Sequence, residues 1–201
     1  MALIDYKNRH TGEKCIIFGL GPSLNLIDNV NLDGIVTIGV NNVQQKCNTD
    51  YLVVIDPIKA FPDYKKSAVI ENTGVLFTNF DEWFKLRKDK VNERIMLGDA
   101  GGKNLMKNIS NNILNRSCTS PFVATALAIY MGFEHIGIIG VDITAPDHFN
   151  VKDGRHILAN RLLKIDQHFG ELNSYHKLYN MSPESGLKSL EKLPLTSFLE
   201  M

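Results

Sequence analysis

Short apolar runs that end in glycine or in small polar residues recur along the chain. They span residues 14–18, 35–40, 51–55, 75–78 and 135–139. Nearly continuous apolar runs of this length are typical of strands that are covered on both faces, as in a parallel sheet. Parallel neighbours need crossover connections, so the pattern also predicts helices between the runs.

Helices are predicted over residues 23–29, 41–47, 58–66, 81–88, 103–115 and 121–131. The last is apolar nearly all round, so we expect it to be buried beside the sheet. Ser120 is placed to act as its N-cap, Pro121 to occupy its first position and Gly132 to end it. The alternation predicts an α/β fold, with a single Rossmann-like domain over residues 1–201 and a mostly parallel sheet flanked by helices.

The character of the chain changes after Asp142. Residues 143–155 contain proline, glycine, histidine and charged residues but few apolar ones, which indicates an exposed loop or lid. With a helix predicted over 156–172, we expect a lid-like insertion at about residues 143–172. A last strand is predicted at 177–181, a turn at 182–186, and one or two short helices beyond residue 187.

The charge balance limits the partners that this chain can attract. It has 22 Lys or Arg and 22 Asp or Glu among 201 residues, so its formal net charge is zero. No general binding to nucleic acid or to a membrane is expected from such a balance. Three widely spaced cysteines argue against a disulfide framework or a zinc site, and no apolar stretch approaches the roughly 20 residues of a membrane span. We therefore expect a soluble, cytoplasmic protein, with a homo-oligomer plausible on general grounds alone.

Small and polar residues follow four of the predicted strands. The carboxyl ends of parallel strands meet at one edge of a sheet, beside helix N-termini that attract anions, so we expect these residues to surround one ligand site. They are Gly19, Gly21 and Ser23 after the first strand, Asn41 and Asn42 after the second, Asp56 after the third, and Gly140 and Asp142 after the fifth.

The glycine pair has two interpretations. Gly19 and Gly21 allow backbone to approach a phosphate or sugar, with Ser23 as a cap or ligand contact, yet a glycine pair after a strand can equally be a tight turn. The dinucleotide fingerprint fails because Leu24 stands at its third glycine position, and the chain contains no Walker loop.

The side chains that follow the other strands also have more than one possible role. Asn41 and Asn42 can bind a base or ribose, or cap a helix. Asp56 can bind a ligand or cap a helix that begins near Ile58. A carboxylate at Asp142 can bind ribose hydroxyls, a metal or the proton of a nucleophile.

Two histidines flank the lid-like segment. His156, and with less support His148, is a candidate general base, because the ordinary pKa of a histidine is about 6.5. No pair of histidines or cysteines has the spacing of a metal site, so no protein-built metal site is predicted. Magnesium carried by a nucleotide remains an open alternative.

Several motifs together resemble the bacterial sialyltransferases that use CMP-activated sialic acid. They are the opening Ile16 to Leu24, Asn41–Asn42, Thr119–Ser120 before an apolar helix that ends near Gly132, and Gly140–Val141–Asp142. The same opening, the strand end Val54 to Pro57 and the tail Leu178 to Ser185 also look like the wider MptE-like group, named for a 6-hydroxymethylpterin diphosphokinase.

The resemblance implies a nucleotide-binding cleft. Its residues would be Gly19, Gly21, Ser23, Asn41 or Asn42, Asp56, Ser120, Gly140 and Asp142. It also implies donor binding without a metal and a histidine base in the lid region, which by position is His156. Two departures, Leu20 between the glycines and Ile143 to Ala145 where tyrosines are expected, favour an activated sugar other than sialic acid.

We therefore predict a glycosyltransferase that moves a sugar from a nucleotide-activated, CMP-sugar-like donor to an acceptor hydroxyl, with no required cofactor. His156 and Asp142 are its predicted catalytic residues. One alternative is an MptE-like diphosphokinase that uses ATP and Mg²⁺, which needs cation clamps of which only Arg116 is evident. The other is a nucleotide-binding protein without catalytic activity.

Overall fold

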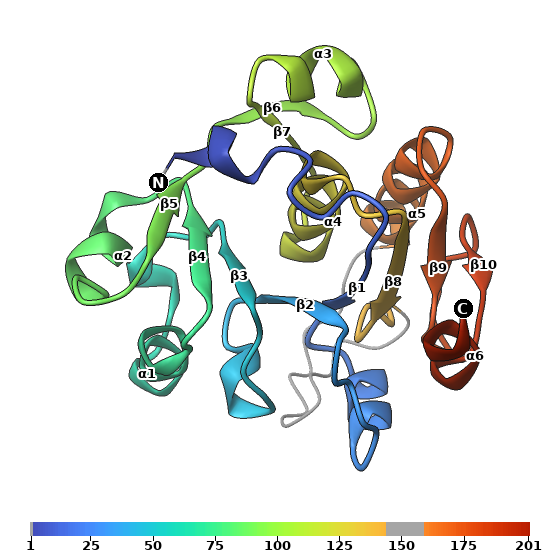
Figure 1. Cartoon of the computed structure of the whole chain (residues 1–201), viewed down its shortest axis with the longest axis horizontal. Helices are drawn as coiled ribbons and strands as arrows, with labels where there is room; N and C mark the ends of the chain where they lie inside the picture. Colours follow the sequence, from blue (N-terminus) through green and yellow to red (C-terminus); the bar gives the residue numbers. More distant parts are fainter. Residues whose placement is uncertain (1, 144–158) are drawn as a thin grey trace.

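The computed structural model describes residues 2–143 and 159–201. Its centre is an eight-stranded sheet in which every pair of neighbouring strands is parallel, with the order β10-β9-β8-β1-β2-β3-β4-β5 (Figure 1). This confirms the predicted α/β fold. The strands are β1 (Lys14–Phe18), β2 (Val36–Val40), β3 (Tyr51–Val54), β4 (Val75–Thr78), β5 (Asn92–Arg94), β8 (His135–Ile139), β9 (Leu178–Asn180) and β10 (Glu191–Lys192).

The apolar runs form strands because both faces of the sheet are covered. Cys15 of β1 is paired with Val36 of β2 on one side and with Ile136 of β8 on the other. Ile16 and Ile17, which point to opposite faces, are both fully buried. A strand without an exposed face cannot alternate apolar and polar residues, which explains the continuous runs in the sequence.

The helices are α1 (Asp63–Glu71), α2 (Asp81–Leu86), α3 (Leu105–Ser110), α4 (Ser120–Met131), α5 (Ala159–Asn173) and α6 (Leu195–Glu200). Helices α4 and α5 lie on one side of the sheet, and α1 and α6 lie on the other (Figure 1). The helices lie on different faces because the crossovers run in opposite directions along the sheet. The chain passes from β1 to β2 in one direction and from β8 to β9 in the other. Right-handed crossovers that run in opposite directions place their helices on opposite faces.

Helix α4 is buried as predicted, but its cap differs by one residue. Thr119 is the N-cap, and its hydroxyl accepts a hydrogen bond from the Phe122 amide at 3.4 Å. Ser120, predicted to be the cap, is the first helical residue. Gly132 ends the helix with a left-handed φ of 83°, the conformation that glycine adopts at least cost.

Two predicted helices are shorter than expected, and a third is divided. The range 23–29 forms only the 3₁₀ helix η2 (Pro22–Ile27), and 41–47 forms only η3 (Val43–Gln45). The range 58–66 divides into η4 (Ile58–Ala60) and the start of α1, because Pro62 removes a backbone donor at the junction.

The predicted helix over 103–115 ends at Ser110. Asn112 turns the chain with a φ of 57°, and β7 (Leu114–Arg116) then pairs with β6 (Leu97–Ala100) in a separate two-stranded parallel sheet. Neither strand was predicted, since both are short and mix polar with apolar residues.

The helix predicted over residues 156–172 is present as α5. Helix α5 occupies residues that were assigned to the insertion, yet Ile165, Phe169 and Leu172 are part of the hydrophobic core. Its apolar face, repeated every three to four residues, therefore docks α5 on the body of the protein. The first half, residues 144–158, lies outside the described residues. None of the described helices combines the length and apolar character that crossing a bilayer requires.

Candidate functional site

The carboxyl ends of β1 and β8 lie side by side at the point where the strand order reverses. The chain leaves β1 toward β2, but leaves β8 toward β9 on the opposite side. In open α/β sheets, ligands bind at such a switch point because the diverging loops open a crevice there. The loops in question are Gly19–Pro22 after β1 and Gly140–Ile143 after β8.

These two loops are bonded to each other. The Gly21 amide donates to the Gly140 carbonyl at 2.7 Å, and the Gly140 amide donates to Ser23 Oγ at 2.9 Å. The Ser23 amide donates to Asp142 Oδ2 at 3.0 Å, while Ser23 Oγ lies 2.6 Å from the hydroxyl of Ser182 after β9. The strand ends of β1, β8 and β9 therefore form one hydrogen-bonded unit around Ser23.

The glycines are needed for this close packing. A Cβ on Gly19 would lie 2.2 Å from the Gly140 carbonyl oxygen, and one on Gly21 would lie 2.1 Å from Asp142 Oδ2. Gly140 itself has a φ of 74°, which disfavours any residue with a side chain. The glycine pair thus has a structural role of its own, independent of any ligand.

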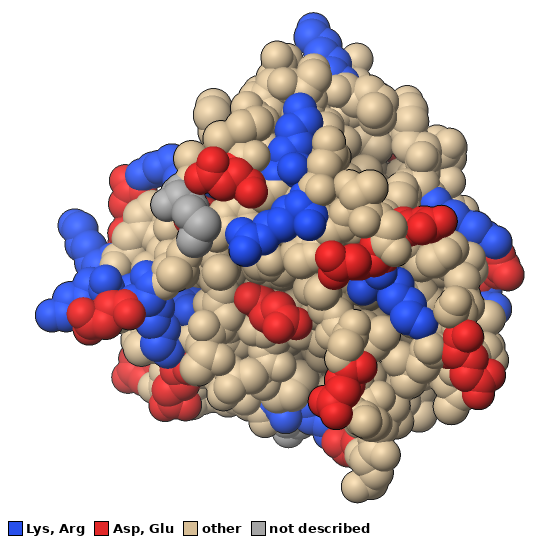
Figure 2. Space-filling model, viewed as in Figure 1, with Lys and Arg blue, Asp and Glu red and all other residues tan. Residues whose placement is uncertain are grey.

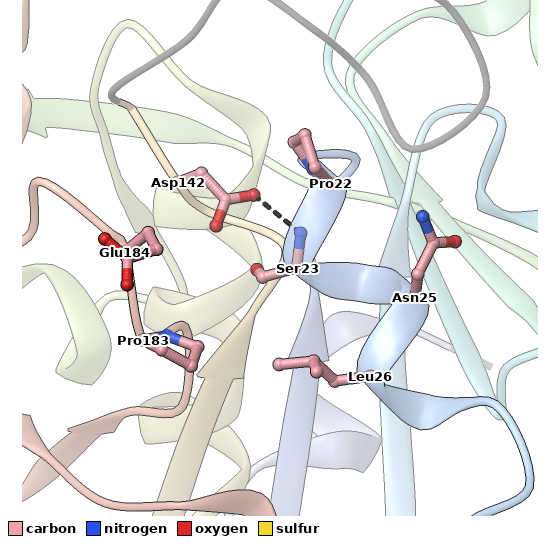
Figure 3. Close-up of a pocket in the computed structure, with 7 residues that line it drawn as sticks. All are labelled: Pro22, Ser23, Asn25, Leu26, Asp142, Pro183 and Glu184. Carbon is pink, nitrogen blue, oxygen red and sulfur yellow. Dashed lines mark hydrogen bonds between the residues drawn. The ribbon is translucent and has the colours of Figure 1, made fainter.

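Beside this unit is a pocket of about 460 Å³ (Figure 3). Pro22 and Leu26 from η2 stand on one side, and Asp142 and the loop after β9 stand on the other. Asp142 is 7% exposed, and the bond from the Ser23 amide holds one of its carboxylate oxygens. The lining residues are Pro22, Ser23, Asn25, Leu26, Asp142, Pro183 and Glu184.

Two residues with a positive φ lie at the same edge of the sheet. Ile143, directly after Asp142, has a φ of 48°, and Asn41 after β2 has a φ of 50°. A positive φ is rare for a β-branched residue and costs about 1–3 kcal/mol, and such strain concentrates at functional sites. Ile143 is therefore a strained residue after a strand end that was predicted to bind a ligand, whereas Asn41, as an asparagine, adopts its positive φ at little cost.

The ends of β2 and α4 meet on the other side of β1. Ser120 Oγ donates to Asn41 Oδ1 at 3.5 Å, so the structure brings these two predicted residues together. Asn42 is 1% exposed, and its amide donates to Gln45 Oε1 at 2.7 Å. Asn42 Oδ1 is buried without a hydrogen-bond partner, an arrangement that costs free energy unless a ligand supplies a donor.

Asp56 extends this row after β3. It is half-buried, and burial raises the pKa of its carboxyl above the ordinary value. The Asp56 carboxylate is not the cap of the Ile58 turn, because Glu82 Oε1 accepts from the Ile58 amide instead, at 2.8 Å. Asn79 after β4 was missed by the sequence analysis, although its Oδ1 is also buried without a partner.

His156, the predicted base, and His148 lie outside the described residues. Arg116, the cation noted in the sequence, is exposed, and its Nε donates to the Gly98 carbonyl at 3.1 Å. In the described part of the chain, no group of three or more His, Cys, Asp or Glu residues is placed to hold a metal ion. Lys and Arg are interspersed with Asp and Glu over the face seen in Figure 2, so an anionic ligand would depend on local groups there.

A scan against protein-family models finds no match, and a search of the curated proteins finds none either. Solved structures do match. A MAf glycosyltransferase from Magnetospirillum magneticum AMB-1 is similar over 95% of this chain, with a TM-score of 0.65 and 16% identity. This chain spans only 37% of that protein.

The sialyltransferase CstII from Campylobacter jejuni, in complex with CMP-3FNeuAc, is similar over 92% of this chain and 87% of its own, with a TM-score of 0.54 and 18% identity. A second structure of that sialyltransferase, with CMP and a trisaccharide acceptor, has a TM-score of 0.55 at 16% identity, over 90% of this chain and 86% of its own. At these identities the likeness shows a shared fold. The class that the comparison defines is an α/β fold similar to that of these glycosyltransferases, whereas the resemblance to the MptE-like group stays a prediction.

Proposed function

We propose that the protein is a glycosyltransferase that moves a sugar from a nucleotide-activated donor to an acceptor hydroxyl. One observation carries this proposal: the polar ends of β1, β2, β3 and β8 lie along one sheet edge, beside a 460 Å³ pocket at the switch point. The glycosyltransferases that share the fold support it.

The chemistry of the pocket fits a nucleoside better than a phosphate. Asp142 and Glu184 are both acidic and would repel a phosphate, whereas carboxylates accept hydrogen bonds from ribose hydroxyls. Pro22, Leu26 and Pro183 offer apolar surface for a base. The phosphate would then lie toward the N-terminus of α4, where the positive end of the helix dipole suits an anion.

The sugar would extend along the row formed by Asn42, Asp56 and Asn79. Hydroxyl groups of a sugar would give the unpaired amide oxygens the donors that they lack. Asp56, when ionised, would disfavour a sugar carboxylate at this place. A neutral sugar therefore suits the row better than an anionic one.

In the reaction, a base takes the proton of the acceptor hydroxyl while that oxygen attacks the anomeric carbon of the donor. The bond from this carbon to the phosphate oxygen breaks, and the phosphate keeps the electron pair. His156 is the proposed base. The α4 N-terminus would stabilise the charge that develops on the leaving phosphate, and no metal is required.

The test is a thermal-shift panel of CMP, UDP, GDP, ADP and ATP, each with and without Mg²⁺. A ligand at about 100 times its dissociation constant adds about 2.7 kcal/mol to the free energy of unfolding, which a melt resolves. We expect stabilisation by CMP that EDTA does not remove. Asp142→Asn should abolish the CMP-induced shift, while Asp33→Asn, at an exposed site that does not line the pocket, should leave it intact.

The other outcomes separate the alternatives. Stabilisation by ATP only with Mg²⁺ would favour the diphosphokinase. Stabilisation by CMP, with no transfer of any sugar and no effect of His156→Ala on donor hydrolysis, would favour a protein without catalytic activity. No stabilisation by any of the five nucleotides would overturn the proposal of nucleotide binding.

A further inference from the structure

The turn that the sequence predicted after β9 has two exposed residues at its tip. The Ser185 amide donates to the Ser182 carbonyl at 3.1 Å, which closes a β-turn with Pro183 and Glu184 at its centre. Proline suits the second position of such a turn because its ring fixes φ. Pro183 and Glu184 are both exposed, whereas the two serines beside them are buried.

The two buried serines hold this turn against the strand ends. Ser182 is fully buried, and its hydroxyl lies 2.6 Å from Ser23 Oγ after β1. Ser185 is 6% exposed, and its Oγ donates to the Val141 carbonyl after β8 at 2.7 Å. Because one of these bonds lies on each side of the tip, the backbone of the tip is held beside the pocket.

The tip residues line the 460 Å³ pocket on the side that faces η2. Leu26 of η2 is 47% exposed and points across the pocket toward Pro183 (Figure 3). Two apolar groups that face each other across a pocket suit the two faces of a planar ring. Asp142 and Glu184 lie together on the side opposite η2 (Figure 3). The pocket therefore suits a flat ligand with hydrogen-bond donors on the edge toward the carboxylates.

Carboxylates select among nucleotide bases because, when ionised, they only accept hydrogen bonds. Cytosine and adenine carry an exocyclic amino group that donates, whereas uracil and hypoxanthine carry a carbonyl oxygen in its place. A ring N–H lies beside that oxygen, but the oxygen still repels a carboxylate that bonds to this edge. A base with the amino group is therefore favoured over its carbonyl counterpart.

The two carboxylates are not equally placed for this contact. Asp142 is 7% exposed and already accepts the Ser23 amide, whereas Glu184 is exposed at the tip of the turn. We propose that Glu184 is a specificity-determining residue, whose carboxylate selects a nucleotide with an amino-bearing base. The inference rests on the proposed function, which places a nucleoside in this pocket.

The test is isothermal titration with two matched pairs of nucleotides, CMP with UMP and AMP with IMP. Each pair shares its ribose and phosphate, so the ratio of the two affinities reports the base alone. We expect the unmodified protein to bind CMP about tenfold more tightly than UMP, or AMP about tenfold more tightly than IMP. A preference within one pair only supports the inference and identifies the base.

Glu184→Gln should reduce that ratio to less than about twofold, because a glutamine amide donates as well as accepts. Two variants at exposed positions serve as controls. Leu26→Ala should weaken both members of a pair by about the same factor, roughly fivefold, and leave the ratio unchanged. Glu200→Gln removes the same charge from α6, outside the pocket, and should change neither affinity.

A ratio that stays near tenfold in Glu184→Gln would overturn the role of Glu184. Equal affinities within both pairs for the unmodified protein, or a preference for UMP and IMP, would overturn the selection of an amino-bearing base. Both results leave the proposed function intact, since a nucleotide is bound. If none of the four nucleotides binds, the proposed function fails first and this inference fails with it.

Discussion

The polar groups on the two sides of β1 differ in their hydrogen bonding within the protein. Toward β8 and β9, Ser23, Gly140, Asp142 and Ser182 are bonded to one another at 2.6 to 3.0 Å. Toward β2 and β4, the buried Asn42 and the half-buried Asn79 each keep a side-chain oxygen that is buried without a partner. One side of the edge is thus satisfied within the protein, and the other is not.

The contrast separates a scaffold from a ligand-facing row. A satisfied network rigidifies the strand ends and fixes the pocket beside them. Buried acceptors without a partner lower the stability of the free protein, and a ligand that donates a hydrogen bond to them removes this cost. Substitutions of the glycines on the β8 side should therefore change stability first, whereas those on the β2 to β4 side should change affinity for the sugar first.

The largest expected effect is that of Gly19→Ala on the β8 side. The added Cβ would meet the carbonyl oxygen and carbon of Gly140 at 2.2 and 2.7 Å, and backbone cannot move aside as a side chain can. We expect a loss of about 3 kcal/mol in the free energy of unfolding, measured by urea denaturation.

Gly34→Ala is the matched control for that substitution. Gly34 has a φ of 79° but nothing within 4 Å of its added Cβ, so it reports conformational strain without a collision. Its cost should be about 1 kcal/mol. Equal costs at both positions would contradict the packing of the two loops.

Asp142→Ala should have the next largest effect. It removes the acceptor of the Ser23 amide, which is partly buried, for a loss of about 2 kcal/mol in the free energy of unfolding. Asp142→Asn keeps an acceptor oxygen and should cost less than half as much. A stability unchanged by Asp142→Ala would show that the loop after β8 does not depend on this bond.

On the other side, Asn79→Ala should leave the free energy of unfolding within about 0.5 kcal/mol, because the oxygen it removes has no partner. Affinity for the intact nucleotide-sugar donor should fall about tenfold, while affinity for the free nucleotide stays unchanged. Titrations with both ligands make the comparison. Equal losses for both ligands would place Asn79 outside the sugar row.

The sequence analysis predicted the central sheet because its strands are buried on both faces. The five strands that it located include β1 and β8, whose continuous apolar runs have no other stable environment. It missed β5, whose residues Asn92, Glu93 and Arg94 carry no apolar pattern and which is held to the sheet by pairing with β4. It also lengthened the helix before β7, although Asn111 and Asn112 are residues that favour the left-handed conformation in which helices end.

Part of the candidate site could be predicted from the sequence, because some of its residues directly follow predicted strands. Residues at strand ends can be placed because parallel strands end at one edge, which is how Ser23, Asn41 and Asp142 were selected. Pro183 and Glu184 reach the pocket from a turn 41 and 42 residues beyond Asp142, and a single sequence carries no record of that contact. Helix α5 was assigned to the lid-like insertion. Its hydrogen bonds from Arg161 to the Cys118 carbonyl and between His168 and Ser117 were therefore not anticipated.

The smallest expected effect is the loss of stability at low pH. It tests whether this loss arises at histidines away from the carboxyl edge of the sheet. Burial lowers the pKa of His176 and of His168 below that of a histidine in the unfolded chain, about 6.5. The unfolded state therefore binds more protons as the pH falls below about 6.5, so the free energy of unfolding should be fully present above that pH and decrease below it. Urea denaturation at pH values from about 7.5 down to 5 measures the decrease, and His176→Gln should reduce its slope. A slope unchanged in His176→Gln but reduced in His168→Asn would assign the acid sensitivity to the α5 contact beside the proposed phosphate site instead.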